Sequence, residues 1–409
     1  MPIQLARALR TTAFVAALLG LPRMAQAIPV FANGQGISCE TCHTVYPAMT
    51  RYGMMVMMSN FQVLNWHLQR QALPTSVRVL VQSYLANQST PGQTQVSDLS
   101  LLTGGFAGKN LTFYNEQHVI DGGQIGDTDQ LWLSWNGLLH GVNSLQVGKF
   151  HTPFPFMPAH AWSLGSYLLA TQTTGQNTFN PNDARWGVAF NGMSNEFMYN
   201  ASYLTGSGPL QSALDYNPAD AQRALDLNVS YGGMEVPWTL GVVGIRGFAP
   251  LYSARPVAPA SAGPVGTFAG SDAFTREGVY YAYQVPKWHL QTMYYHGYDA
   301  RPDLDEFGVS LNGFMIELQR DFGWRNHVLV RYDVASSDTL NRQYVLDVDH
   351  SLAPNIKLVG EVLAGPGMQP QYRVLLGYAG PWLRGRRYLY DGPHGIRVAS
   401  PNATTSKGS

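Results

Sequence analysis

Cys39 and Cys42 are the only two cysteines in the 409-residue chain, and His43 directly follows the second of them. In a Cys-x-x-Cys-His run the two thiols can bond to the vinyl groups of a haem, and the histidine is placed to ligate its iron. Because the chain has no further cysteine, it cannot build a second such site or a cysteine-rich zinc site. The motif therefore predicts one covalently bound haem c, held by Cys39, Cys42 and His43, and hence one-electron chemistry.

Two other uses of the cysteine pair stay open. A thioredoxin-type redox couple has the same spacing, but it belongs to a βαβ setting that does not surround this pair. A local structural disulfide would suit an oxidising compartment. Neither gives a role to the histidine that follows, so haem attachment is the preferred interpretation.

The sixth iron ligand is not fixed by the motif. A methionine ligand raises the haem potential relative to a second histidine, which suits electrons from a relatively oxidising donor. Methionine also fills irregular gaps in protein cores, so each methionine taken alone is explained by packing. Histidines further along the chain, such as His118 and His151, are more remote possibilities. The candidates from the same segment are Met49, Met54, Met55, Met57, Met58 and His67.

No second catalytic centre is evident in the sequence. The chain has no His-Glu-x-x-His run, no nucleophile elbow and no phosphate-binding loop. Two acidic runs, Asp127-Thr128-Asp129 and Asp303-Leu304-Asp305-Glu306, could touch a metal cation at a loop. Acidic loop residues are more often simply solvated.

The first residues predict export from the cytoplasm. Arg7 and Arg10 form a basic region, residues 13–21 are a short apolar stretch, and residues 25–27 (Ala-Gln-Ala) resemble a cleavage site. The apolar stretch is too short for a membrane-spanning helix. We therefore expect residues 1–27 to be a signal peptide.

Composition limits the class of protein that the remaining chain can form. Only 13% of residues are charged, whereas 12% are aromatic and 42 are glycine. Acidic and basic residues balance at 26 each, so nothing indicates a nucleic-acid partner. Low charge with many aromatic and glycine residues is typical of an outer-membrane barrel, although a soluble all-β protein can share it.

From Ser76 onward the dominant pattern is strict alternation of apolar and polar residues, which places successive side chains on opposite faces of a sheet. Residues 225–231 (Leu-Asp-Leu-Asn-Val-Ser-Tyr) are the clearest case. Charged residues on one face and apolar residues on the other suit a barrel with lipid outside and water inside. A soluble sandwich is the competing fold. The same alternation recurs in segments 328–334, 344–349, 356–362 and 371–378.

The alternating segments number sixteen, an even count as in single-chain bacterial barrels. Long irregular segments at 151–185, 206–222 and 249–273 read as external loops, and short turns separate other strands. The barrel is expected over residues 76–380, followed by a tail at 381–409 that does not alternate. The predicted strands are 76–86, 96–106, 111–119, 129–135, 143–150, 186–192, 196–205, 223–231, 238–248, 274–283, 287–297, 308–319, 326–334, 342–350, 356–363 and 371–379.

Residues 28–75 form a segment that is very short for an independent haem domain, because a small chain buries too little apolar surface to fold robustly alone. We expect this mainly helical segment to pack against or inside the barrel. The sequence thus predicts an all-β fold: an antiparallel outer-membrane barrel of about sixteen strands preceded by a monohaem cytochrome c segment.

This order of elements resembles a known family. Residues 29–32 (Pro-Val-Phe-Ala), Gly36, the Cys39–His43 motif, Pro47 and Gly53 look like the N-terminal signature of the fused monohaem cytochrome c–porins of iron-oxidising bacteria. The resemblance implies an outer-membrane electron conduit, with electron transfer of an iron–cytochrome c oxidoreductase type. Extracellular Fe(II) or another reductant would be the donor, and a periplasmic cytochrome or other soluble carrier the acceptor.

Two other functions remain possible from the sequence. One is a diffusion porin in which the haem segment gates the pore or senses redox state. The other is a soluble periplasmic haem enzyme with an open iron position. In the preferred reading the barrel contacts outer-membrane lipid, and the haem segment lies at the periplasmic side or inside the lumen.

Overall fold

The computed structural model describes most of the predicted barrel and parts of the segment before it. Cys39 and the predicted signal peptide lie outside the described residues. The structure describes residues 30–32, 42–43, 49–64, 67, 69, 73–86, 93–140, 142–153, 167–171, 173–206, 222–232, 236–253, 268–305, 307–323, 325–337, 340–353, 356–381, 389–390 and 396–397.

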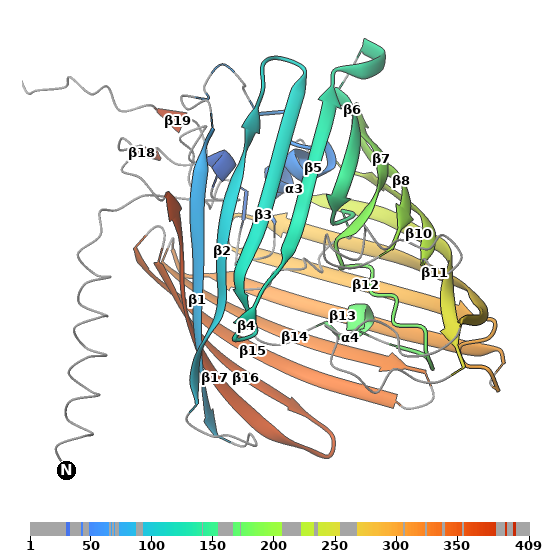
Figure 1. Ribbon diagram of the computed structural model, residues 1–409. Helices are drawn as coiled ribbons and strands as arrows, with labels where there is room; N and C mark the ends of the chain where they lie inside the picture. Colours follow the sequence, from blue (N-terminus) through green and yellow to red (C-terminus); the bar gives the residue numbers. More distant parts are fainter. Residues whose placement is uncertain are drawn as a thin grey trace, which may run out of the picture.

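Sixteen long strands form one antiparallel sheet in the described part of the chain, which confirms the predicted fold class of the barrel (Figure 1). They are β1 (Thr75–Ala86), β2 (Thr94–Phe106), β3 (Leu111–Asp121), β5 (Thr128–Asn136), β6 (Val142–Phe150), β7 (Arg185–Ser194), β8 (Phe197–Thr205), β9 (Arg223–Tyr231), β10 (Trp238–Tyr252), β11 (Phe268–Val285), β12 (Trp288–Asp299), β13 (Val309–Asp321), β14 (Asn326–Ser336), β15 (Leu340–Ala353), β16 (Ile356–Gly365) and β17 (Met368–Pro381).

The sheet closes on itself. Each long strand pairs with the strands before and after it in the sequence, and β1 pairs with β17 in a register that sets Val79 opposite Tyr378. Closure leaves no open sheet edge, which is what a barrel in lipid requires. The shorter elements are β4 (Gln124–Ile125), β18 (Leu389–Tyr390), β19 (Ile396–Arg397), the helices α3 (Arg51–Met58) and α4 (Leu168–Thr171), and the 3₁₀ helix η3 (Leu138–His140). No helix among the described residues is long and apolar enough to cross a membrane.

The two ends of the barrel differ in their connections. One end, which we call the short-turn end, lies at the top of Figure 1 and holds α3 nearby. The opposite, long-loop end carries the longest connections. The short-turn end joins strands through residues 107–110, 137–141, 195–196, 232–237, 286–287, 322–325 and 354–355. The long-loop end joins them through 87–93, 122–127, 151–184, 206–222, 253–267, 300–308, 337–339 and 366–367.

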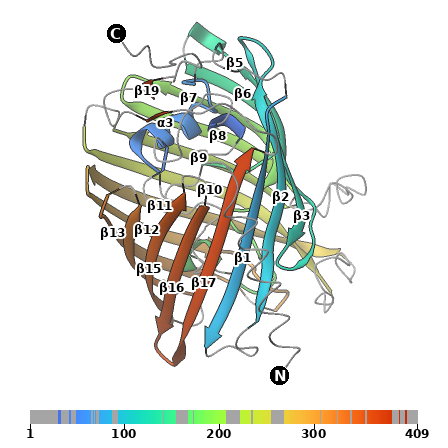
Figure 2. The ribbon, with the colours of Figure 1, turned by 90° about the vertical axis from the view of Figure 1, so that its left-hand side faces the viewer.

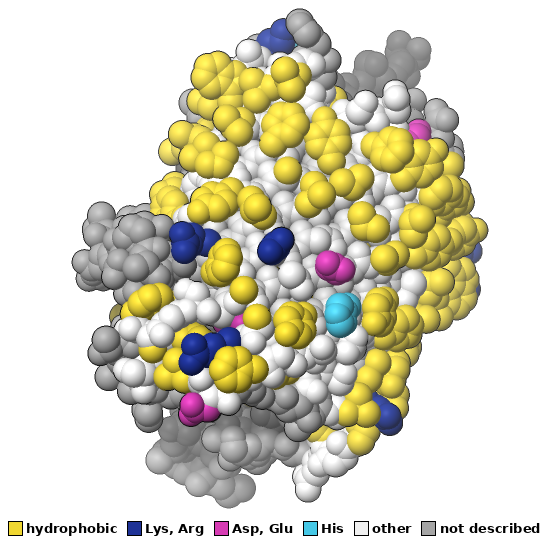
Figure 3. Space-filling model, turned by 90° about the vertical axis from the view of Figure 1, so that its right-hand side faces the viewer, with side chains coloured by type: hydrophobic (Ala, Val, Ile, Leu, Met, Phe, Trp, Pro, Cys, Tyr) yellow, Lys and Arg dark blue, Asp and Glu magenta, His cyan; other side chains and the backbone are white. Residues whose placement is uncertain are grey.

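The two faces of the wall follow the alternation in the sequence. Along β9, the apolar Leu225 and Leu227 are exposed on the outside, whereas Asp226 and Asn228 are buried inside. Figure 3 shows hydrophobic side chains spread over one outer face with few charged groups among them. The predicted arrangement, apolar outside and polar inside, is therefore confirmed. Other charged side chains on the inner face are Arg331, Asp333, Asp347, Asp349 and Glu361.

Strand ends differ from the sequence prediction most at the expected loop 249–273. There β10 and β11 continue as a paired ribbon, with Ala249 opposite Asp272 and Tyr252 opposite Phe268. The remaining connection is only 253–267. The sequence did not predict these strand ends, because Pro250 and the small residues of this region interrupt the alternation of apolar and polar residues.

The expectation that 151–185 is an external loop is only partly right, because its described residues fold into the lumen. The helix α4 lies against β13, β14 and β15. Gly313 on β13 allows this contact, since a Cβ there would overlap the Leu169 side chain. The Tyr167 hydroxyl donates a hydrogen bond to Glu317 on the inner wall, with an O–O distance of 3.0 Å. The segment is poor in charge, and that composition is the sequence signal of its burial.

Candidate functional site

The helix α3 begins and ends at clear local signals. The Thr50 side chain accepts a hydrogen bond from the Gly53 amide at 3.0 Å, which caps the first turn. After Met58 the chain leaves the helix through Asn60 and Phe61, which both have positive φ values of 50° and 67°. This turn directs Phe61 away from the helix axis and toward the wall of the barrel.

The Cys42–His43 pair lies directly against the start of α3. The Thr50 amide donates to the Cys42 carbonyl at 2.9 Å, and His43 pairs with Met49 in an antiparallel bridge. A Cβ at Gly53 would overlap the Cys42 carbonyl oxygen, so only glycine allows this approach. Cys42 and His43 are therefore held in place by backbone contacts with the start of α3.

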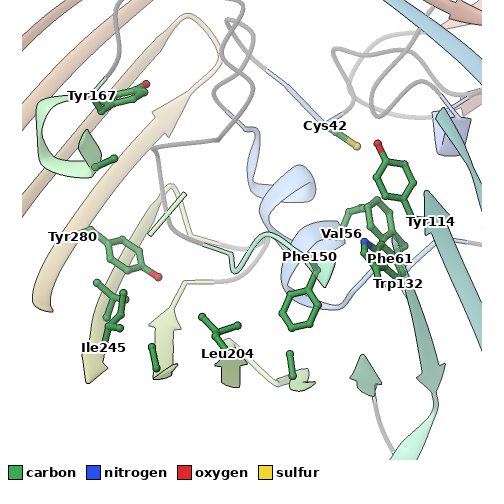
Figure 4. Packing of buried hydrophobic residues seen from close by; sticks show 14 of the residues in the cluster. Cys42, Val56, Phe61, Tyr114, Trp132, Phe150, Tyr167, Leu204, Ile245 and Tyr280 are labelled. Carbon is green, nitrogen blue, oxygen red and sulfur yellow. The ribbon is translucent and has the colours of Figure 1, made fainter. Parts of the chain in front are cut away.

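The described parts of the N-terminal segment are packed inside the barrel, near the short-turn end (Figure 2). Phe31 and Phe61 stack with ring centroids 4.0 Å apart. They meet Tyr114 of β3 at 6.2 Å and Trp132 of β5 at 5.9 Å, respectively. Figure 4 shows Cys42 in this buried cluster, on the same side as Tyr114. We call residues 30–32, 42–43 and 49–64 the plug.

Hydrogen bonds also tie the plug region to the wall. The Gln69 side chain donates to the Phe106 carbonyl at 2.8 Å and accepts from the Phe106 amide at 2.5 Å. The Gln62 side chain accepts from the Gly137 amide at 3.1 Å, at the short-turn end. Backbone groups of two wall segments are thus satisfied by Gln62 of the plug and by Gln69, which follows it in the sequence.

The predicted sixth-ligand candidates are dispersed. Met54 and Met58 are buried, and Met49, Met55 and Met57 are half-buried. Met49 and Met54 line a small cavity with His289 at the short-turn end. His67 is exposed. His118 and His151 lie on or just after wall strands β3 and β6, whereas Met49 pairs with His43 through the backbone.

The residues of the plug suit a covalently held haem in their chemistry. Cys42 is 6% exposed and lies among aromatic side chains, and burial raises the pKa of its thiol to about 12. A buried neutral thiol is inert as a nucleophile or free metal ligand. Thioether formation with a haem vinyl group suits such an apolar setting, with His43 half-buried next to it. The position of Cys39 falls outside the described residues.

A second cluster of chemically capable side chains lies on the inner wall toward the long-loop end. Glu116 and His118 of β3 and Asp129 of β5 bring one ligand atom each within 4.8 Å of one another. His151, just after β6, places its Nε2 2.8 Å from Asp129 Oδ2. The sequence indicated His118, His151 and Asp129 separately, but it did not indicate Glu116 or the convergence of Glu116, His118 and Asp129.

Neighbouring groups set the charge of this second cluster. Arg78 contacts Asp98 and lies 2.6 Å from Glu116 Oε1. Burial alone would lower the pKa of His151, but the Asp129 carboxylate beside it raises the pKa above its usual value. The Asp303 run, by contrast, bonds to Gln176 of the inserted loop and joins no comparable cluster among the described residues.

The inserted loop is held by a third, fully buried network. Arg331 lies over the Tyr167 ring, 3.9 Å from its centroid, and its Nε is 3.0 Å from Asp333. Burial and the nearby Glu317 carboxylate raise the pKa of Tyr167 well above its usual value, so the hydroxyl stays a hydrogen-bond donor. The described residues of the plug and of the loop thus contact the inner wall toward opposite ends of the barrel.

Solved outer-membrane barrels share this fold. OmpTdeltaL8, a loop L8 deletion mutant of OmpT from Vibrio cholerae, matches with a TM-score of 0.55 and 12% identity over 75% of this chain and 99% of its own. An anion-selective porin from Comamonas acidovorans matches with 0.52 and 13% identity over 76% and 99%. Salmonella typhi OmpF in complex with daunomycin matches with 0.52 and 8% identity over 75% and 97%.

These likenesses establish a porin-like outer-membrane barrel as the fold. No protein-family model matches the chain, and no curated protein matches it.

Proposed function

We propose that this chain is an outer-membrane electron conduit in which a haem c on the plug accepts electrons from an extracellular reductant, Fe(II) in the first instance. A periplasmic cytochrome or another soluble carrier would take the electron onward. The observation that carries the proposal is the burial of Cys42 and the start of α3 inside a porin-like barrel. A redox group held there would lie inside the barrel wall, open to a reductant that enters from the long-loop end.

The chain's own residues supply what such a conduit needs. Cys39, Cys42 and His43 would hold the haem, which supplies one-electron chemistry when bound. Phe31, Phe61 and their wall partners keep water from that part of the lumen. The short-turn end corresponds to the periplasmic side and the long-loop end to the outside, as in bacterial barrels generally.

The alternative is a diffusion porin whose haem-bearing plug gates the pore or senses redox state. The porin-like neighbours favour this reading, since one of them is an anion-selective porin. The conduit is supported by the burial of Cys42 beside α3, which packs against the inner wall. The two functions differ in whether solutes or electrons cross.

The first experiment is a haem and reduction assay on the purified, detergent-solubilised protein. We expect one haem c per chain, reduced on addition of Fe(II). The Cys42→Ala variant should lose covalent haem while the barrel still shows heat-modifiable migration. A wild-type protein that carries haem but is not reduced by Fe(II) at any pH from acid to neutral would contradict the iron role. A protein without haem would contradict the conduit altogether.

A further inference from the structure

The structure assigns a binding site for a divalent first-row transition-metal cation to the inner wall of the barrel, formed by Glu116, His118 and Asp129, with His151 bound to Asp129 as an outer partner. These residues come from β3, β5 and the end of β6, on the long-loop side of the plug. Nothing in the haem motif depends on them, so the cation site is separate from the plug.

The site is built by an irregularity in the strands. On β3, Glu116 and His118 are two residues apart and both face inward. On β5, regular alternation would turn Asp129 outward. The register between β3 and β5 shifts there, because Glu116 pairs with Gln130 while Gln117 pairs with Thr128. Asp129 is the extra residue of this bulge, and bulges re-aim side chains next to functional sites.

His151 positions Asp129 within the cluster. Its Nδ1 lies 2.5 Å from the Asn182 carbonyl oxygen, which can only accept, so Nδ1 carries a proton. Its Nε2 faces Asp129 Oδ2 at 2.8 Å. A bare nitrogen lone pair would repel that carboxylate, and a metal ion bound to both atoms would hold them about 3.4 Å apart. A second proton therefore joins His151 to Asp129, and His151 orients this ligand from outside the cation site.

The donor set selects the kind of cation. One imidazole nitrogen with two carboxylate oxygens suits Fe(II), Mn(II), Co(II) and Zn(II), whereas Ca²⁺ and Mg²⁺ prefer oxygen alone. Metal–ligand bonds of about 2.0–2.2 Å set ligand atoms about 3.4 Å apart in a tetrahedron. The clustered atoms therefore need only small inward movements from their present separations of up to 4.8 Å.

Outer partners orient the ligands as in known metal sites. The Asn182 carbonyl fixes His151, and the Tyr114 hydroxyl donates to Glu116 Oε2 at 2.7 Å. Arg78 and Lys149 face this region as well: Arg78 is shared by Asp98 and Glu116, and the Lys149 ammonium donates to the Thr128 carbonyl at 2.6 Å. Arg78 and Lys149 thus offset part of the charge of the nearby carboxylates Asp98, Glu116 and Asp129.

The site would place the cation next to the plug. Tyr114 is two residues from Glu116 on the same face of β3, a rise of about 7 Å, and its ring contacts Phe31 of the plug. That Fe(II) is the natural occupant rests on the proposed function. The existence of the site does not.

The test is equilibrium dialysis of the full, folded protein against Co(II), with bound cobalt and haem iron counted separately by elemental analysis. We expect one cobalt per chain, and binding weakened about tenfold or more by Asp129→Asn and by His118→Gln. His296→Gln on the outer wall and Asp303→Asn at the 300–308 connection are matched controls that should bind as wild type does. Heat-modifiable migration shows whether each variant has folded.

Two results would overturn the site. One is the absence of stoichiometric cobalt in wild type. The other is equal cobalt binding in wild type and in folded Asp129→Asn. Cobalt binding together with a haem that Fe(II) does not reduce would leave the site standing and remove the proposed ferrous role.

Discussion

At the scale of single residues, the chain places a few polar groups where strand geometry alone would not. Asp129 faces the lumen only because β5 carries one extra residue there. Tyr114 joins two environments, since its ring lies in the aromatic cluster and its hydroxyl donates to Glu116. The pairing of His43 with Met49 likewise depends on Gly53, where any side chain would meet the Cys42 carbonyl.

Replacing Tyr114 by phenylalanine should destabilise the barrel by about 1–3 kcal/mol, because the buried Glu116 carboxylate loses a hydrogen-bond donor. The measurement is the urea midpoint for loss of the folded, heat-modifiable form. Tyr203→Phe is the control, since Tyr203 is 46% exposed on the outer face. Equal midpoints for both variants would show that the Tyr114 hydroxyl contributes nothing.

At the scale of elements, two short helices toward opposite ends of the lumen each depend on a close contact at a glycine. The first turn of α3 lies against Cys42 at Gly53, and α4 lies against β13 at Gly313. Neither helix is long enough to be stable alone, so tertiary packing must hold each of them. Small changes at these contacts should therefore release a segment without opening the sheet.

Gly313→Ala should displace α4, because the new Cβ overlaps the Leu169 side chain, at a cost of about 1–3 kcal/mol. The inserted loop should become more sensitive to protease, while the barrel stays folded. Gly360→Ala on β16 is the matched control, since a Cβ there meets only a carbonyl oxygen at 4.0 Å. Identical cleavage rates in the two variants would contradict the described packing of α4.

Phe61→Ala should loosen the plug, because Phe61 stacks on Phe31 and lies close to Trp132. Losing a buried phenylalanine costs about 3–5 kcal/mol. In planar bilayers we expect larger or more frequent conductance steps than for wild type. Phe322→Ala, at a side chain that is 58% exposed, should leave conductance unchanged. A plug that is equally closed in both variants would show that this stack does not hold it.

At the scale of the whole molecule, much of the fold could be predicted from the sequence. Alternation of apolar and polar residues along segments such as 225–231 predicted the number of strands. It also predicted which side chains face outward and which face inward, because lipid favours apolar side chains and the lumen favours polar ones. It could not reveal that the 151–184 connection folds inward, because irregular backbone carries no period. Nor could it bring Glu116, His118, Asp129 and His151 together, because that requires the register of three strands and a bulge.

The whole molecule also separates an apolar exterior from a lumen lined by charge. Buried ion pairs such as Arg276 with Asp299, 2.9 Å apart, lie inside, while large apolar side chains are exposed outside. This is the polarity of a porin-like outer-membrane barrel, which has lipid outside and polar groups inside.

Electron transfer into sealed vesicles measures most directly whether this chain carries electrons across a membrane. Full-length protein is reconstituted into liposomes that contain a soluble c-type cytochrome, and Fe(II) is added outside with a chelator trapped inside to exclude leaked iron. Vesicles with wild-type protein should reduce the enclosed cytochrome, whereas vesicles with folded Cys42→Ala should not. If the enclosed cytochrome stayed oxidised while small sugars swelled the same vesicles, the electron conduit would be contradicted. The protein would then be a diffusion porin.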